Sequence, residues 1–253
     1  MNPPAPAGRI GLIRPQWAAP PRVHAAFTLR TGGVSTGPYA SLNIGAHVGD
    51  AAEAVNENRR RVCAHLALAA QPAWVEQVHG IGVRELDRPA DAAQQPADAV
   101  IARRPGAVCV IQVADCMPVL FAAADGSAVA AAHAGWRGLA AGVLEATVAR
   151  LGLDPGALAA WIGPAIGPRH FEVGAEVRAA FMSHDAAASV AFVPNARGRW
   201  QCDLPALARQ RLSALGVGSV VGGEWCTYAD PERFFSYRRG GQCGRMAALI
   251  WLT

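Results

Sequence analysis

Three residues of this 253-residue chain have the types and settings of ligands in a catalytic metal site: His79, Cys116 and His133. They lie in QVHG, VADCMP and AAHAGWRG, and we expect each where a strand gives way to a loop. A sheet fixes the position of such side chains, while the loop leaves them accessible. Because the three are dispersed along the chain, they do not form a local finger motif. Two imidazoles and one thiolate are ligands that a catalytic zinc site uses, with a fourth position open for chemistry.

Each of these residues also has a simpler interpretation. A histidine near a strand end is usually only hydrogen-bonded, and a cysteine among apolar residues usually only fills space. Turn and close-approach signals after each residue favour a site instead. Without a metal, Cys116 and His133 would suit a cysteine hydrolase, with His133 as the base. A structural zinc site would need a fourth protein ligand, for which Cys226 and His170 are the nearest candidates.

The ligand types leave two metals open, because a soft thiolate with two imidazoles accepts zinc or copper alike. A conventional laccase, with a blue-copper centre and a trinuclear cluster, needs about ten histidines. The chain has seven, which excludes that class. A lone copper centre with Met117 as axial ligand stays open, although Pro118 beside it gives little reason to expect the right geometry. We therefore predict zinc, with copper as the alternative.

Several arginines have settings that suit an anion. Arg137 follows the strand of His133 and begins an expected helix, whose first turn has free N–H groups. Near the C-terminus, in FFSYRRGGQCGRM, Arg238, Arg239 and Arg245 lie among glycines and close to Tyr237. Planar guanidinium groups suit phosphate or carboxylate, and the aromatic ring could stack on a base. A solvated turn with ordinary surface arginines explains the same pattern equally well.

Asp115, next to the predicted thiolate ligand, is a candidate proton shuttle. Its alternative role is that of a turn residue that supports the ligand from behind. The glycine-rich stretch RTGGVSTGP matches neither GxGxxG nor GxxxxGK[ST], so it does not indicate a phosphate-binding loop of either kind.

Composition excludes several function classes. The 23 basic residues are all arginine, so mechanisms that need a Schiff-base or P-loop lysine are excluded. The net charge is +4, but the arginines are scattered, so we expect no nucleic-acid partner. Six cysteines without a CxxC pair indicate reduced thiols in a cytoplasm. Prolines near the start stand where a signal peptide would need an apolar run, so we expect no signal peptide. No apolar run is long enough to span a bilayer, so we expect no membrane span. We expect a cytoplasmic monomer.

Periodicity predicts the elements that must position these residues. A Pro-rich, loosely held lead-in is expected over residues 1–22, followed by one catalytic domain over 23–253. Asp50 and Glu53 have the spacing of a capping box for the first helix. Helices are expected over residues 51–69, 139–152, 175–182 and 204–216. Strands are expected at 24–29, 73–79, 82–87, 97–102, 107–115, 118–124, 127–135, 159–167, 219–223 and 246–252. The nearly continuous apolar strands predict an α/β fold, a single-domain layered sandwich with a mixed central β-sheet.

At QVHG, ADCMPVLF, HAGWRGL, GPAIGP and FFSYRRGGQCGRM the sequence resembles the YfiH-like family, also called the laccase-domain or multicopper polyphenol oxidase family. The likeness runs from TLRTGGVS and YASLNIGAHVGD through NENRRRV to the closing ALIWL. This resemblance implies a compact α/β sandwich and a zinc-dependent purine nucleoside phosphorylase that also deaminates adenosine and cleaves methylthioadenosine. The older family name implies copper-dependent oxidation of phenols, and some relatives are linked to the editing of peptidoglycan precursors. Both remain alternatives.

The resemblance also assigns residues. The family's metal ligands correspond to His79, Cys116 and His133. Arg30 and Asn43 match the arginine of its T-x-R-x-GGVS stretch and the asparagine of its SLN stretch, both near the family pocket. We therefore expect a purine nucleoside and phosphate as substrates. Their contacts are expected from Arg30 and Asn43, together with the C-terminal Arg238 and Arg239.

Overall fold

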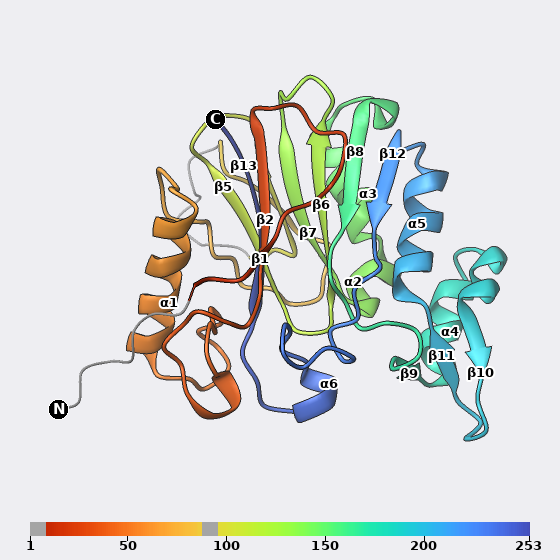
Figure 1. Cartoon of the computed structure of the whole chain (residues 1–253). Coiled ribbons are helices and arrows are strands. Elements are labelled where there is room, and N and C mark those ends of the chain that lie inside the picture. Colours follow the sequence, from red (N-terminus) through yellow and green to blue (C-terminus); the bar gives the residue numbers. More distant parts are fainter. Residues whose placement is uncertain (1–8, 88–95) are drawn as a thin grey trace.

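Two β-sheets packed face to face form the centre of the computed structural model, which describes residues 9–87 and 96–253 (Figure 1). The four-stranded sheet has the order β1 (Leu12–Ile13), β2 (Val23–Thr28), β13 (Met246–Leu252) and β5 (Val108–Val113). The six-stranded sheet has the order β12 (Ser219–Gly222), β8 (Leu158–Ile162), β6 (Met117–Ala123), β7 (Val129–Ala134), β4 (Ala99–Ala102) and β3 (Val83–Glu85). A small third sheet contains β10 (Phe192–Pro194), β11 (Trp200–Cys202) and β9 (Glu172–Val173).

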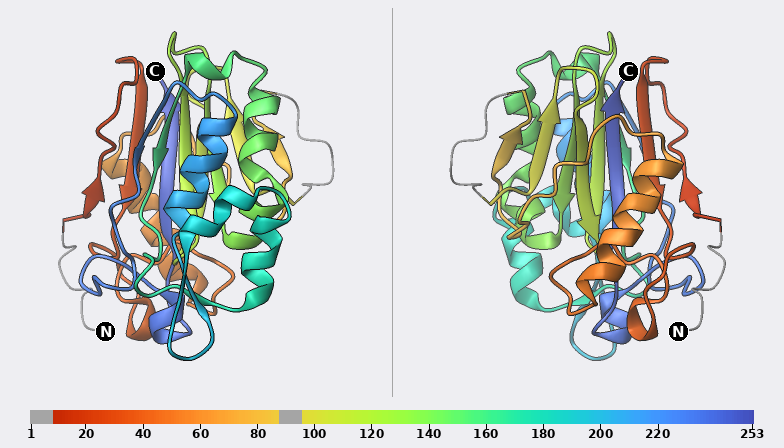
Figure 2. Two further views of the ribbon diagram at one scale, coloured as in Figure 1. Left: turned by 90° about the vertical axis from the view of Figure 1, so that its right-hand side faces the viewer. Right: turned by 90° about the vertical axis from the view of Figure 1, so that its left-hand side faces the viewer.

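Helices cover the outer faces of the two large sheets, as the side views show (Figure 2). Helix α1 (Ala52–His65) packs on the four-stranded sheet. The six-stranded sheet is covered by α2 (Trp136–Ala141), α3 (Val143–Leu151), α4 (Ala175–Met182) and α5 (Leu204–Ala214). The short α6 (Tyr237–Gly240) lies near the end of the sheets, and three 3₁₀ turns occupy Gly37–Tyr39, Pro155–Ala157 and Ala186–Ala191.

The strands read as continuous apolar runs because both of their faces are buried. In β5, Cys109 and Ile111 face the six-stranded sheet, whereas Val108 and Val110 face α1. The six-stranded sheet is mixed, since β3 with β4 and β12 with β8 are parallel pairs and the other pairs are antiparallel. The predicted α/β sandwich with a mixed sheet is thus confirmed, and a second sheet is added to it.

Several predicted boundaries differ from the structure. The helix expected over 139–152 is two helices, because Gly142 adopts a left-handed φ of 103° between them. The segment 73–79 is not a strand and makes only one isolated bridge, from Ala73 to Cys109. The predicted capping box is absent, since Ala51 is the N-cap of α1 and makes no side-chain cap bond. Asp50 instead accepts hydrogen bonds from the side chains of Ser35 and Asn43.

The beginning of the described chain is attached to the four-stranded sheet. Leu12 and Ile13 pair with β2, and Ile10 is buried. Residues 1–8 of the expected lead-in lie outside the described residues. No helix within the described ranges is both long and apolar enough to cross a membrane.

Asn58 of α1 fixes the loop that contains Arg30 and Asn43. Its fully buried amide donates to the hydroxyl of Ser35 and to the carbonyls of Ser41 and Asn43. Its Oδ1 accepts the backbone N–H of Val34 at 2.8 Å. The loop is therefore held by one side chain that satisfies four backbone or side-chain groups.

Replacing Asn58 with Ala leaves those buried groups without partners, so we expect a loss of about 2–4 kcal/mol in the free energy of unfolding. Urea denaturation measures it. Glu57→Ala is the control on the same helix, because its ion pairs with Arg60 and Arg61 lie at the surface and contribute little to stability. Equal losses in the two variants would contradict this role of Asn58.

Candidate metal centre and pocket

The candidate site lies where the chain crosses from one large sheet to the other. Strand β5 of the four-stranded sheet ends at Val113, and β6 of the six-stranded sheet begins at Met117. Asp115, in this crossing, has a left-handed φ of 86°. Cys116 follows it directly. His133 of β7 is paired with Pro118 of the neighbouring strand β6, two residues after Cys116. The crossing therefore brings the thiol and one imidazole together at the edge of the core between the sheets.

His79 reaches the site from a loop, so the prediction that it ends a strand is wrong. Its φ is 61°, and the backbone N–H groups of Val78, His79 and Gly80 all donate to the carboxylate of Asp98. These bonds measure 3.2, 2.9 and 2.7 Å. Three converging donors around one carboxylate hold the loop without a strand.

Asp98 also orients His133, whose Nδ1 lies 2.8 Å from Asp98 Oδ1. That contact leaves Nε2 of His133 for a metal, as a carboxylate commonly does for a ligating histidine. Burial raises the pKa of the fully buried Asp98 carboxyl, but the bonds from His133 and the loop N–H groups outweigh it, so the pKa is lowered. Sequence reasoning missed Asp98. A signal was present, since ADAVIA places one acid at the start of an otherwise apolar strand.

The structure brings the three predicted ligands together. Their ligand atoms lie within 4.8 Å of one another, with Cys116 Sγ 3.6 Å from His79 Nε2. Burial raises the pKa of the Cys116 thiol, but the charge and hydrogen bonds of His133, with a smaller effect of His79, lower it overall and favour the thiolate. Thiolate is the form that binds metals. Among the described residues, no other set of three His, Cys, Asp or Glu side chains has this arrangement.

Gly135 gives the ligands their room. A Cβ at this position would lie 2.9 Å from Cys116 Sγ and 3.0 Å from His79 Cδ2, closer than real contacts allow. The glycine of HAGWRG is therefore a steric requirement of the site.

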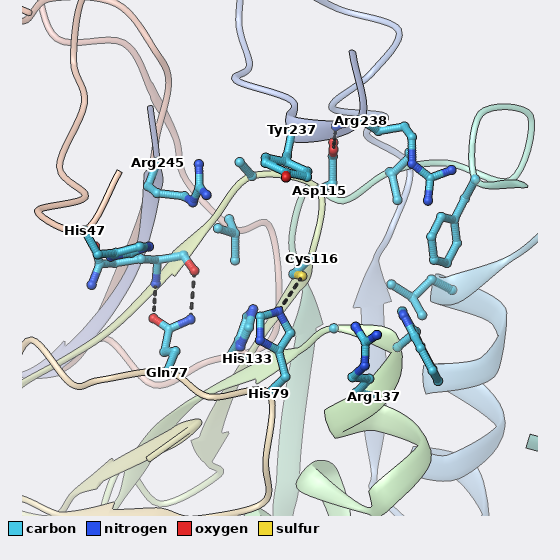
Figure 3. A pocket seen from close by; sticks show the side chains of 18 residues that line it. His47, Gln77, His79, Asp115, Cys116, His133, Arg137, Tyr237, Arg238 and Arg245 are labelled. Carbon is cyan, nitrogen blue, oxygen red and sulfur yellow. Dashed lines mark hydrogen bonds between the residues drawn. The ribbon is translucent and has the colours of Figure 1, made fainter. Parts of the chain in front are cut away.

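The ligands open into a pocket of about 480 Å³. Figure 3 shows Arg137 and Arg238 on one side of the ligand group and His47 and Arg245 on the other. The lining comprises His47, Gln77, His79, Gln112, Val113, Ala114, Asp115, Cys116, His133, Gly135, Trp136, Arg137, Ile166, Phe171, Leu204, Tyr237, Arg238 and Arg245. Arg137 stacks over Trp136 at 4.5 Å and has no hydrogen bond or ion pair within the described chain. Burial, followed by the charges of Arg245 and Arg59, lowers the pKa of His47, which keeps its ring neutral.

Of the five residues to which catalytic or substrate contacts were assigned, Asp115 and Arg238 line the pocket. The anion and base candidates Arg137, Tyr237 and Arg245 line it as well. Asp115 is buried, and its carboxylate accepts bonds from Thr227 Oγ1 at 2.6 Å, Ser236 Oγ at 3.0 Å and the N–H of Arg238 at 2.7 Å. The Arg238 side chain donates to the carbonyl of Glu172 and lies over Phe171.

Arg30, Asn43 and Arg239 are not part of the pocket lining. The Arg30 guanidinium donates to the carbonyls of Ala40 and Pro231. Arg239 donates to the backbone carbonyls of Thr227, Tyr228 and Phe234. The Asn43 amide accepts from the N–H groups of Gly45 and Arg245 and is fully buried. These three side chains hold the loops around the pocket.

Comparison with known proteins adds independent findings. Residues 24–253 match the family model described as multi-copper polyphenol oxidoreductase laccase. The chain is 54% identical over 241 residues to a purine nucleoside phosphorylase of Pseudomonas aeruginosa, covering 95% of this chain and 98% of the relative. It is 53% identical to the purine nucleoside phosphorylase YfiH of Escherichia coli, with the same coverage. A crystal structure of a Neisseria meningitidis protein matches with a TM-score of 0.91 and 45% identity, covering 95% of this chain and 98% of that one.

Replacing Cys116 with Ala is expected to abolish metal binding, because the two remaining imidazoles lack the thiolate. The wild-type chain should hold close to one metal ion per chain, since the described residues contain one such set. Elemental analysis after gel filtration measures the ratio, and circular dichroism checks the fold. Full occupancy in a folded Cys116→Ala variant would show that the ligand assignment is wrong.

Asp98→Asn is expected to weaken metal binding roughly 10- to 100-fold, because the amide cannot accept all four hydrogen bonds that hold both histidines. Competition with a chromogenic chelator measures the dissociation constant. Asp125→Asn is the matched control, since Asp125 only closes its own turn by accepting the N–H of Ser127. Unchanged affinity in Asp98→Asn would remove Asp98 from the site.

Proposed function

The chain belongs to the YfiH-like family, whose model bears the laccase description, and from this premise we propose that it is a zinc-dependent purine nucleoside phosphorylase. The observation that carries this proposal is the group of His79, Cys116 and His133, the one such group within the described residues, in a pocket with three arginines. Two relatives more than 50% identical over most of the chain bear the name purine nucleoside phosphorylase, which supports the same activity.

The ligand group fits zinc by its chemistry. Two imidazoles and one thiolate leave one position open, as catalytic zinc sites do. Because Nδ1 of His133 contacts Asp98, Nε2 of His133 is left to face the metal position between the three ligand atoms. Zinc held there would supply a Lewis acid for a substrate oxygen.

Phosphate binding is assigned to Arg137 and Arg238. Both lie on the same side of the ligand group, and the Arg137 guanidinium has no partner within the described residues other than the ring of Trp136. A planar guanidinium binds phosphate oxygens in pairs. In phosphorolysis a phosphate oxygen attacks the anomeric carbon of the ribose, and the bond to the purine nitrogen breaks. The two arginines would hold that oxygen in line and neutralise the charge of the anion.

The purine base is assigned to the side of the pocket with His47, Tyr237 and Gln112. Tyr237 is 59% exposed, and its ring can stack on a base. The neutral ring of His47 can donate or accept a hydrogen bond there. Gln112 also lines the pocket but is only 7% exposed, and its Oε1 is buried without a hydrogen-bond partner among the described residues.

For Asp115 we favour the supporting role over the proton shuttle. Its carboxylate already accepts three hydrogen bonds, one of them from the backbone of Arg238. By this contact it positions the arginine assigned to phosphate. Arg30, Asn43 and Arg239 are likewise proposed to act by holding the surrounding loops.

Copper-dependent phenol oxidation is the second candidate, because the family model bears that description. All seven histidines lie in the described residues, and only His79 and His133 join a group of three metal-ligating side chains there. Four-electron reduction of oxygen needs a copper cluster that this set does not complete. Adenosine deamination and methylthioadenosine cleavage would use the same pocket as phosphorolysis. One chromatographic assay measures all three reactions.

Zinc-loaded protein given adenosine or inosine with phosphate is expected to release free purine base and ribose 1-phosphate, measured by chromatography. Hypoxanthine from adenosine would add deamination, and methylthioadenosine is assayed in parallel. Cys116→Ala should lose the activity, because the Lewis acid is lost with the ligand. Absence of base release across these nucleosides, together with rapid copper-dependent oxidation of a phenol, would favour the oxidase instead.

Arg137→Ala is expected to raise the Michaelis constant for phosphate roughly 10- to 100-fold, the loss of a charge-assisted contact, with a smaller effect on that for nucleoside. Arg30→Ala is the matched comparison, because the Arg30 side chain is held by the carbonyls of Ala40 and Pro231. Its main effect should fall on the free energy of unfolding. A larger phosphate effect in Arg30→Ala than in Arg137→Ala would return the anion site to Arg30.

A further inference from the structure

A second cysteine and histidine pair lies behind the pocket wall. Cys226 Sγ is 3.5 Å from His170 Nδ1 and accepts the backbone N–H of Gly167 at 3.2 Å. The His170 ring stacks on Tyr228 with centroids 4.6 Å apart and planes 19° apart, which fixes its orientation. Both members of the pair are partly exposed. The pair thus combines a nucleophilic sulfur, a base and a backbone donor.

The surrounding backbone leaves room for this contact. A Cβ on Gly167 would lie 3.1 Å from the Cβ and 3.2 Å from the Sγ of Cys226, so a glycine allows the close approach. The pair does not belong to any group of three metal-ligating side chains within the described ranges. Its arrangement therefore favours thiol chemistry over metal binding.

The other cysteines differ from Cys226 in ways that make them poor competitors. Four are buried, and burial raises the pKa of each thiol: Cys63, Cys109, Cys202 and Cys243. Cys116 is the proposed metal ligand. Cys226 is the partly exposed thiol that remains, and it has an imidazole within reach.

We propose that Cys226 is a site of reversible thiolation, in which it forms a mixed disulfide with a low-molecular-weight disulfide. His170 Nδ1 takes the proton of the thiol, and the thiolate attacks one sulfur of the disulfide. The new S–S bond forms as the old one breaks, and the departing thiolate takes up the proton from His170. Cys226 is oxidised, and one half of the disulfide is reduced to a thiol.

An adduct at Cys226 would reach the phosphorolysis pocket through its neighbours. Cys226 forms an isolated parallel β-bridge with Ala165. The next residue, Thr227, donates its backbone N–H to the carbonyl of Ala165 and its hydroxyl to the carboxylate of Asp115. The N–H of Ile166, which lines the pocket, donates to the carbonyl of Asp115 at 3.0 Å. A bulky group on Cys226 would push the segment of Cys226 and Thr227 away from that of Ala165 and Ile166. Because both segments contact Asp115, the adduct would disturb Asp115 and slow phosphorolysis. This consequence rests on the proposed function, whereas the thiolation itself does not.

The test is incubation of the zinc-loaded chain with glutathione disulfide as the probe, followed by mass mapping of cysteine peptides. We expect one adduct, on the peptide of Cys226, removed by dithiothreitol. His170→Phe keeps a ring against Tyr228 but removes Nδ1, and the adduct should form roughly three- to tenfold more slowly. His170→Asn, which keeps a polar group but no base, should be slowed as well. Cys63→Ser is the control and should leave the rate unchanged.

An adduct mainly on another cysteine, no adduct, or an unchanged rate in both His170 variants would overturn the proposal. Cys226→Ser should keep the activity of the untreated protein and should no longer respond to glutathione disulfide. Phosphorolysis that is unaffected by a complete adduct on Cys226 would overturn its effect on the pocket. If the untreated protein performs no phosphorolysis, the proposed function fails, while the mapped adduct still decides the thiolation.

Discussion

The carboxylate of Asp98 is the interaction on which the site depends. It accepts three backbone N–H groups of the loop of His79 and also binds Nδ1 of His133. One buried carboxylate therefore orients two of the proposed ligands, which come from distant parts of the chain. Its four donors offset the cost of burying it, and loss of the carboxylate would release both histidines together.

The two packed sheets supply the other half of the geometry. Because β5 and β6 belong to different sheets, the short connection between them must cross the core edge, and it brings Asp115 and Cys116 there. Asp115 then holds Thr227, Ser236 and the backbone of Arg238. The same crossing thus positions Cys116, the proposed metal ligand, and also Arg238 of the pocket lining.

Much of this arrangement could be predicted from the sequence. The apolar strands and the residue types of His79, Cys116 and His133 carry local signals, and a strand buried on both faces is visible in its composition. The helix over Ala175–Met182 has the predicted bounds. Gly142, by contrast, breaks a periodic helix through its left-handed φ, which periodicity does not reveal.

What could not be predicted depends on contacts between distant segments. Arg30 and Asn43 have the residue types of substrate contacts, yet their polar atoms bind groups of loops far away in the sequence. Arg239 binds three carbonyls of the segment just before it instead of a ligand. Arg137 has no such partner within the described residues. Arg137 therefore differs from Arg30 and Arg239 in having no carbonyl partner among the described residues, and single-sequence patterns do not contain that information.

The central claim is that His79, Cys116 and His133 hold one zinc ion with an open position. X-ray absorption at the zinc edge tests it most directly on the purified protein. The account predicts one sulfur at about 2.3 Å, two imidazole nitrogens at about 2.0–2.1 Å and one light atom from an exchangeable ligand. Two sulfurs, no sulfur, or four protein ligands around the zinc would contradict it.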